Sequence, residues 1–178
     1  LTGLLGPAKR VMAMSGTAIP ERVVDNRVVK VRTEDNIQLM MDFGDACYAT
    51  ITTGFTMQKY KGAGIEIYGT EGTIQMLGED WDPRGYELWR NDHGCWESYE
   101  QRGFWPWTDG VRDFVEAINQ GRAPVNRPDH AYHVLEIMVK ALEAGRTGQA
   151  LPILSTFEPL HVDAAAQKVA PHLDHAPN

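Results

Sequence analysis

Hydrophobic and polar residues alternate with a period of two through the first hundred residues, which predicts a series of β-strands. Two of the runs, Ile37–Phe43 and Cys47–Phe55, flank the pair Gly44-Asp45, which favours a hairpin turn. The other strand-like runs are AKRVMAMSG (8–16), NRVVKVRTED (26–35) and the segments at 65–67, 74–76, 86–90 and 95–100. We therefore expect antiparallel strands joined by short turns over this part of the chain.

After residue 107 the apolar spacing changes to the helical period. The segment TDGVRDFVEAINQG (108–121) predicts a helix with Thr108 as its cap and Gly121 as its stop. The segment NRPDHAYHVLEIMVKALEAGRTG (126–148) predicts a longer helix with Pro128 in its first turn and Gly145 at its end. The expected apolar faces are Val111, Phe114, Val115 and Ile118 in the first helix and Val134, Leu135, Met138 and Leu142 in the second.

The first residues, LTGLLGPAKR, are typical of the end of a helix. Leu1, Leu4 and Leu5 share a helical face, Gly6 is a natural C-terminal cap and Pro7 blocks continuation. A helix of fewer than two turns is not stable alone. We therefore expect the natural protein to continue before Leu1 and this chain to be a fragment of it.

Strands followed by helices predict an α+β fold, namely an open, mostly antiparallel β-sheet with helices packed on one face. The regular alternation of a doubly wound nucleotide-binding domain is missing from the pattern. We expect one α+β domain over residues 1–152 and a partly irregular C-terminal extension over residues 153–178.

Composition narrows the classes of partner. The 178 residues carry a formal net charge of -7 with no basic stripe, which disfavours binding to nucleic acid or to an anionic membrane surface. No apolar run approaches the ~18 residues of a membrane span. Cys47 and Cys95 lie far apart and form no CxxC motif, which is typical of free thiols in a cytoplasmic protein.

The glycine-rich segment AGIEIYGTEGTIQML (63–77) raises the question of a phosphate-binding loop. Gly62 and Gly64 give the first pair of a GxGxxG fingerprint, but Ile67 occupies the third position, and a strand rather than a helix follows. Gly69 and Gly72 instead surround Thr70-Glu71 as a hairpin turn would. We therefore expect a turn and no cofactor-binding residues here.

The strand that ends in YGTEGTI resembles the second domain of the glucose-fructose oxidoreductase and inositol dehydrogenase family, Gfo/Idh/MocA. LTGLLGPAKRVMAM is similar to that family's helix end and first strand after the active-site helix, and the segment 109–151 is similar to its closing pair of helices. The resemblance covers about residues 1 to 152. It implies a sheet domain joined to a Rossmann domain that binds NAD or NADP, with the outer sheet face commonly forming the oligomer interface.

The chain also departs from the family's pattern at its catalytic and cofactor-binding motifs. The family's Glu-Lys-Pro lysine and glycine fingerprint are absent, and its Asp-x-x-x-His pair would lie just upstream of Leu1. The resemblance therefore implies no catalytic residue in this chain and no cofactor bound by it. We expect this chain alone to be inactive.

One Asp-x-x-x-His does occur, at Asp129 and His133, one helical turn apart. That spacing could couple a base to the group that orients it. The resemblance places this pair on the wrong helix, and Asp129 beside Pro128 also suits a first turn without any catalytic duty. His130 and His133 are spaced as metal ligands can be, but no third ligand is evident, so we expect no metal site.

Two segments are candidates for contact with a substrate. GFTMQKYKGAG (54–64) brings Phe55 and Tyr60 close to Lys59 and Lys61, which suit a hydroxylated or anionic ligand, and the resemblance puts this loop at the active-site cleft. The alternative is a solvated loop with one packed aromatic. In GFWPWTDG (103–110), Trp105 and Trp107 suit a sugar face or, as the favoured alternative, core packing. Exposed aromatics on the sheet, such as Tyr48 or Trp89, would mark an oligomer interface.

Three functions remain open from the sequence. The first is the substrate-binding and oligomerisation half of an NAD(P)-dependent oxidoreductase acting on a sugar, polyol or related small molecule. The second is a non-catalytic binding or assembly module that keeps the sheet for dimerisation. The third is a relative that uses NAD in a hydrolytic or epimerising cycle. The presence or absence of the family's motifs before Leu1 would separate the second from the others.

Overall fold

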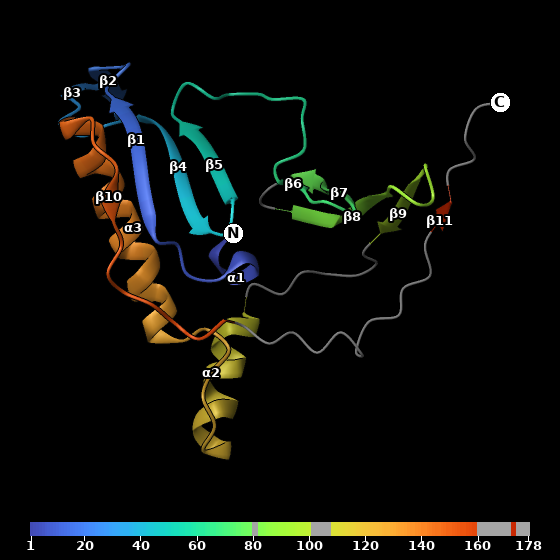
Figure 1. Ribbon diagram of the computed structural model, residues 1–178. Coiled ribbons are helices and arrows are strands. Elements are labelled where there is room, and N and C mark those ends of the chain that lie inside the picture. Colours follow the sequence, from blue (N-terminus) through green and yellow to red (C-terminus); the bar gives the residue numbers. More distant parts are fainter. Residues whose placement is uncertain (80–81, 101–107, 160–171, 174–178) are drawn as a thin grey trace. The chain divides into compact units, whose positions relative to one another are not determined.

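The computed structural model of the chain describes residues 1–79, 82–100, 108–159 and 172–173 (Figure 1). The chain divides into two compact units. The first unit comprises Leu1–Lys59 with Thr108–His161, and the second comprises Tyr60–Trp107 with Val162–Asn178.

The first unit is a mixed sheet-and-helix structure. Strands β10, β1, β4 and β5 form an antiparallel sheet in that order, and β2 and β3 form a separate hairpin. Its elements are α1 (Thr2–Leu5), β1 (Arg10–Gly16), β2 (Glu21–Val24), β3 (Arg27–Lys30), β4 (Asn36–Gly44), β5 (Cys47–Gly54), α2 (Asp109–Gln120), α3 (Pro128–Thr147) and β10 (Leu151–Pro152).

The alternation of residues along the strands sets the two faces of this sheet. The inner face contributes to a buried core of Ala8, Val11, Met41, Phe43, Ile137, Ala141 and Ile153. The outer face carries the intervening residues, which include Met12, Met14, Met40 and Tyr48 and are exposed. The predicted α+β fold, with a mostly antiparallel sheet and helices on one face, is confirmed. Ile153 and Phe157 are buried in this unit, although the sequence placed a domain boundary after residue 152.

Helix α3 covers the inner face by packing on β1, and Gly145 makes the close approach possible (Figure 1). A Cβ on Gly145 would lie 2.4 Å from Ser15 Oγ and 3.3 Å from the Ser15 backbone nitrogen, so a larger residue would force Ser15 or the helix to shift. The prediction that Gly145 ends the helix was wrong. The helix continues to Thr147, and Gly148, with a φ of 69°, caps it in the left-handed conformation.

The helix faces also differ from the prediction. The buried side of α3 consists of His133, Ile137, Ala141 and Ala144, whereas Leu135 and Met138 of the predicted stripe are exposed. Small residues at 141 and 144 let the helix approach the sheet, which hydrophobicity alone does not predict. In α2 the predicted stripe forms, but all four of its residues are exposed and only Ala117 is buried.

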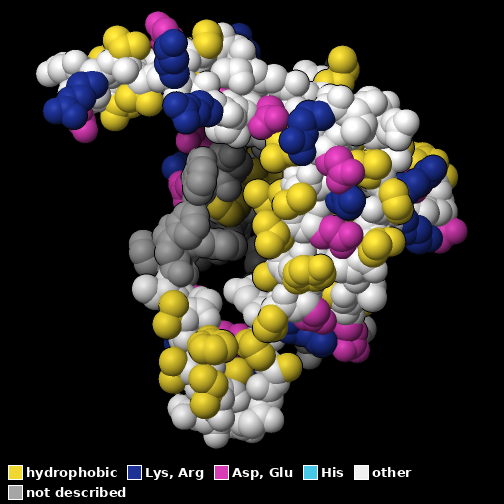
Figure 2. Space-filling view, turned by 90° about the vertical axis from the view of Figure 1, so that its left-hand side faces the viewer, with side chains coloured by type: hydrophobic (Ala, Val, Ile, Leu, Met, Phe, Trp, Pro, Cys, Tyr) yellow, Lys and Arg dark blue, Asp and Glu magenta, His cyan; other side chains and the backbone are white. Residues whose placement is uncertain are grey.

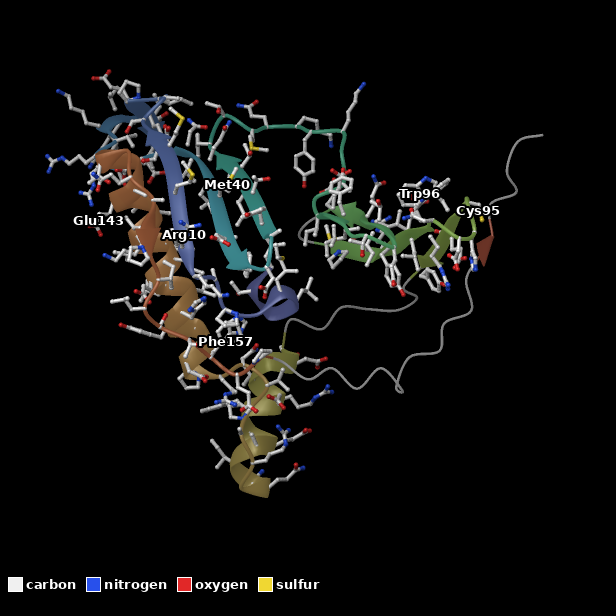
Figure 3. The ribbon with its side chains drawn as sticks, in the orientation of Figure 1. Arg10, Met40, Cys95, Trp96, Glu143 and Phe157 are labelled. Carbon is white, nitrogen blue, oxygen red and sulfur yellow. The ribbon has the colours of Figure 1, made fainter. Side chains whose placement is uncertain are left out.

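The fully buried imidazole of His133 joins three segments of this unit. Its Nε2 accepts the backbone N–H of Ala8 at 3.0 Å, just before β1. Its Nδ1 therefore carries the proton and donates to the carbonyl oxygen of Ser155 at 3.1 Å. Phe157, at the start of α3 in Figure 3, covers this ring and the ring of His130. These contacts make His133 a structural residue rather than a base, and Asp129 pairs with Arg127 instead.

The second unit is an antiparallel sheet whose strands lie in the order β11-β9-β8-β7-β6. Its hairpin at YGTEGT is confirmed, because Ile67 and Ile74 are opposite each other across β6 and β7. A Cβ on Gly72 would lie 2.0 Å from the carbonyl oxygen of Trp89, so glycine is required there. The strands are β6 (Glu66–Tyr68), β7 (Gly72–Glu79), β8 (Asp82–Arg90), β9 (Trp96–Glu100) and β11 (His172–Leu173).

Two hairpin turns in the first unit differ from what the sequence predicted. The β4–β5 hairpin turns at Asp45 and Ala46, which have φ of 52° and 60°, one residue later than predicted. A second pair of positive φ values at Asp25 and Asn26 joins β3 to β2, a strand that the sequence reading missed. Both pairs are suited to a two-residue hairpin with left-handed central residues. The segment after Lys30, predicted as strand, is irregular up to Asp35.

The burial of His133 predicts a specific dependence of stability on pH. Burial lowers the pKa of His133, so the folded chain favours the neutral imidazole while the unfolded chain takes up a proton near pH 6.5. Stability is therefore complete above about pH 6.5 and falls below it, by at most about 1.4 kcal/mol per pH unit from this residue. Denaturant unfolding between pH 5 and pH 8 measures this slope.

His133→Gln is the matched variant, because Gln can still accept the Ala8 N–H but does not titrate. It should be less stable than the natural chain at pH 8 and have a flatter profile between pH 6.5 and pH 5. An equally steep profile in the variant would show that other groups cause the dependence.

Candidate substrate-binding site

The ends of β1, β4 and β5 meet at one end of the sheet in the first unit. Asn36 at the start of β4 lies opposite both Gly16, at the end of β1, and Gly54, at the end of β5. A Cβ on Gly54 would lie 2.0 Å from Asn36 Oδ1, so a larger residue would displace the Asn36 side chain. The candidate substrate loop begins directly after Gly54, so the sheet fixes its first residues.

Asp35 organises this end of the sheet. Its carboxylate accepts the backbone N–H groups of Ala18 at 2.7 Å and Ile19 at 3.0 Å, and it binds Arg22 Nη2 at 2.7 Å. Its side chain is only 3% exposed. The bond from Ala18, followed by those from Ile19 and Arg22, outweighs desolvation and lowers the pKa of Asp35. Asp35 thereby attaches the β2–β3 hairpin to the sheet.

Arg22 and Phe55 extend this cluster toward the loop. The guanidinium carbon of Arg22 lies 3.8 Å from the centroid of the Phe55 ring, in a cation–π contact. The backbone N–H of Phe55 donates to the carbonyl oxygen of Asp35 at 2.7 Å. The buried Nε of Arg22 has no acceptor among the described residues. The result is a fixed cation beside an exposed aromatic ring, which suits an anionic or hydroxylated ligand.

Two hollows lie at this end of the sheet and share Asn36, Ile37 and Thr53. One, of about 330 Å³, is bordered by Arg22, Phe55 and Leu142. The other, of about 440 Å³, is bordered by the polar side chains Ser15, Gln38, Thr52 and Thr56 and by the apolar Met14 and Met57. Thr56 donates to Asn36 Oδ1 at 2.7 Å, which links the loop to the sheet. Hydroxyl and amide groups beside apolar surface are the chemistry that binds small hydroxylated molecules.

A larger hollow of about 940 Å³ lies in the second unit over the hairpin of β6 and β7. Its floor is formed by Ile67, Ile74 and Leu88, and its charged rim is formed by Arg90 and Asp92, which already bind each other at 3.0 Å. Size alone therefore favours this hollow, but the convergent polar groups and the unsatisfied Arg22 Nε favour the end of the sheet in the first unit.

The predicted substrate residues fall into three groups. Phe55 lies in the cluster at the end of the sheet. Lys59 is the last residue of the N-terminal segment of the first unit, and Tyr60 and Lys61 are the first residues of the second unit. All three are exposed. Trp105 and Trp107 lie outside the described residues. The substrate-binding roles of all six residues stay predictions.

The sequence reading missed Arg22, Asp35, Asn36 and Thr56. Asp35 and Asn36 had a usable signal, because an acidic and an amide residue directly precede an apolar strand in TEDNIQLMM. Arg22 had none, since its contacts with Asp35 and Phe55 join residues that are distant in the sequence.

The outer face of the same sheet is a second functional candidate. Met14 is 80% and Tyr48 is 62% exposed, and Met12 and Met40 are opposite each other across β1 and β4. Arg10 and Asp42 form an ion pair on this face. Arg10 and Met40 are labelled in Figure 3. The bond from Arg10 lowers the pKa of Asp42. Flexible thioethers and an aromatic ring favour contact with another protein surface.

Other kinds of site receive no support. Within residues 1–79, 82–100, 108–159 and 172–173, no group of three or more His, Cys, Asp or Glu residues could hold a metal ion. In the same residues, no helix has both the length and the apolar character that a membrane crossing requires.

The fold is shared with solved structures of oxidoreductases. An NAD-binding oxidoreductase from Klebsiella pneumoniae superposes with a TM-score of 0.70 at 16% identity, over 86% of this chain and 47% of its own. An aldose-aldose oxidoreductase from Caulobacter crescentus, complexed with glycerol, gives 0.64 at 16% identity, over 83% and 42%. A levoglucosan dehydrogenase with NADH and levoglucosan gives 0.67 at 19% identity, over 83% and 45%.

The sequence comparison agrees with the fold. Residues 1–75 match the family described as the GFO/IDH/MocA C-terminal domain. No curated protein matches this chain. Over these residues the chain resembles the C-terminal domain of the Gfo/Idh/MocA family, and the resemblance seen in the sequence is confirmed. It spans about half the length of the solved structures that it matches.

Replacing Asp35 by Asn tests the cluster at the end of the sheet. The variant loses the charge that holds Arg22 and two backbone N–H groups, so the amides of the β2–β3 hairpin should exchange hydrogen roughly tenfold faster or more. Hydrogen exchange followed by mass spectrometry measures this change.

The amides of β1 and β4 should keep their protection in Asp35→Asn. Asp42→Asn, which removes an acidic partner of Arg10 on the outer face, is the control and should leave the hairpin unchanged. Because the pKa of Asp35 is lowered, the natural hairpin should stay anchored above about pH 4 and loosen only as pH falls further. Unchanged hairpin exchange in Asp35→Asn would remove the anchoring role.

Proposed function

We propose that this chain is the substrate-binding and oligomerisation domain of an NAD(P)-dependent oxidoreductase that acts on a sugar, a polyol or a related small molecule. The observation that carries the proposal is the family match over residues 1–75, together with a fold shared with oxidoreductases of about twice this length. Two of the matched structures are complexes with glycerol and with levoglucosan, which supports a hydroxylated substrate.

In the proposed reaction, hydride passes between a substrate carbon and the nicotinamide ring of NAD or NADP, which a separate Rossmann domain binds. Residues outside this chain transfer the accompanying proton. The residues of this chain bind and orient the substrate. Phe55, Lys59, Tyr60 and Lys61 form a wall of the cleft, and Arg22, Asn36 and Thr56 fix the base of that loop.

Tyr60→Phe in the complete enzyme tests the cleft assignment. Loss of one substrate hydrogen bond, about 0.5–1.5 kcal/mol, should lower kcat/KM by roughly threefold to tenfold while the melting temperature and cofactor affinity hold. Steady-state kinetics on a panel of sugars and polyols, beside thermal melting, measures the effect.

Tyr68→Phe is the matched control, because Tyr68 is an exposed tyrosine on β6 whose hydroxyl binds Glu66 at 3.0 Å. This control should leave kcat/KM unchanged. Equal kcat/KM in the natural enzyme and in Tyr60→Phe would exclude a substrate contact by the Tyr60 hydroxyl. Failure of every sugar and polyol to be oxidised would contradict the proposed function itself.

The exposed outer sheet face supports the oligomerisation part of the proposal. A methionine-rich face that none of the described helices covers is unfavourable in water, and a specific interface there would bury about 1,000 Å² or more in total. This face also favours the second candidate function, a non-catalytic assembly module, which shares the same interface and differs only in lacking turnover.

Charge placed on this face should separate the copies. Met14→Glu/Met40→Glu introduces two carboxylates on each copy. Because both copies contribute the same positions to a symmetric interface, association would bury four unpaired charges, and the apparent mass should fall to that of a monomer. Light scattering over a range of concentrations measures the mass. Val23→Glu, an exposed apolar position on the β2–β3 hairpin, is the control and should stay associated. A natural chain that is monomeric at all concentrations would refute the interface.

A further inference from the structure

Helix α2 carries an apolar face that stays exposed among the residues that the structure describes. The α2 face consists of Val111, Phe114, Val115 and Ile118 in the helix and Val125 after it, and each is between 51% and 67% exposed. Figure 2 shows hydrophobic side chains gathered over α2, the lowest element of the view. Ala117 is the only buried residue of this helix.

Such a helix requires a partner for physical reasons. An isolated helix of 12 residues is marginal in water, and most helical stability in proteins comes from packing an apolar face. Charged side chains along α2 already have partners within the same segment, because Arg112 pairs with Asp109 at 2.9 Å and Arg122 with Asp113 at 2.7 Å. The partner surface is therefore expected to be apolar rather than charged.

The fold also determines which chain segments lie near α2. The connection from α2 to α3 folds back along α2, because Asp113 accepts the backbone N–H of Val125 at 2.7 Å. This brings the first turn of α3 toward α2. Thr2 Oγ1 lies 2.8 Å from His130 Nε2 in that turn, so the chain entering at Leu1 lies at the same end of the unit. Figure 1 shows α1 at the end from which α2 extends.

We propose that the α2 face docks the dinucleotide-binding domain of the same enzyme. This inference rests on the proposed function, in which that domain forms the rest of a protein about twice as long. A domain joined before Leu1 would be tethered beside α2, at a high effective concentration, whereas a second copy would have to reach the face from solution. The outer sheet face remains available for the second copy.

The double variant Phe114→Glu/Ile118→Lys tests this docking. It replaces two apolar contacts by an i, i+4 pair in the favourable order, leaves the net charge unchanged and uses stronger helix formers, so α2 itself should persist. In the complete enzyme, the natural protein should melt in one transition that NADH raises. The variant should melt in two transitions, of which NADH raises only one. Differential scanning calorimetry with and without NADH measures both.

Phe114→Leu/Ile118→Leu keeps an apolar face and should melt like the natural enzyme. In the 178-residue chain alone, the charged variant should bind less of a hydrophobic dye, while helix content by circular dichroism and mass by light scattering stay unchanged.

Two results would overturn the docking. One is a charged variant that still binds NADH and melts in a single transition at the temperature of the natural enzyme. The other is conversion of an associated natural chain to a monomer by the α2 variant, which would assign the face to a second copy. If the complete protein binds no NAD(H) at all, the proposed function fails first, so the two failures are distinguishable.

Discussion

The first unit depends on one buried polar contact, the imidazole of His133 between Ala8 and Ser155. This single ring ties the start of β1, the middle of α3 and the segment after β10 together. A buried imidazole with one nitrogen accepting and the other donating keeps both partners satisfied without a charge. Glu136 supports the same segment by accepting the N–H groups of Leu154 and Ser155. With α3 held on β1, the inner face of the sheet is closed.

With the inner face covered, we propose a different partner for each of three remaining surfaces. Since α3 occupies the inner face, the outer face with Met14 and Tyr48 is left for contact between copies. The end of the sheet, where Asp35 attaches the β2–β3 hairpin and Arg22 lies on Phe55, is left for a small ligand. The apolar side of α2 is left for another domain. The three surfaces differ in chemistry: the outer face is rich in methionine, the end of the sheet combines polar and apolar groups, and the α2 face is apolar.

The sequence predicted the strands well because alternation is a local signal, and Ile67 lies opposite Ile74 as the pattern required. It failed where a contact joins distant residues. Gly145 had the local character of a helix stop, but it is a packing residue against Ser15. Phe55 could be named as a site candidate from the loop, whereas Arg22 could not, because its contacts with Asp35 and Phe55 join residues distant in the sequence. The roles of Lys59, Tyr60 and Lys61 stay predictions.

The central claim is that this chain forms the wall of a substrate site and leaves the dinucleotide to another domain. Calorimetric titration of NAD, NADH, NADP and NADPH into the 178-residue chain tests it most directly. The account predicts no saturable heat with any of the four, because no strand-to-helix glycine loop occurs in the part of the chain that the structure describes. Saturable binding of any of them at micromolar concentration would contradict the account.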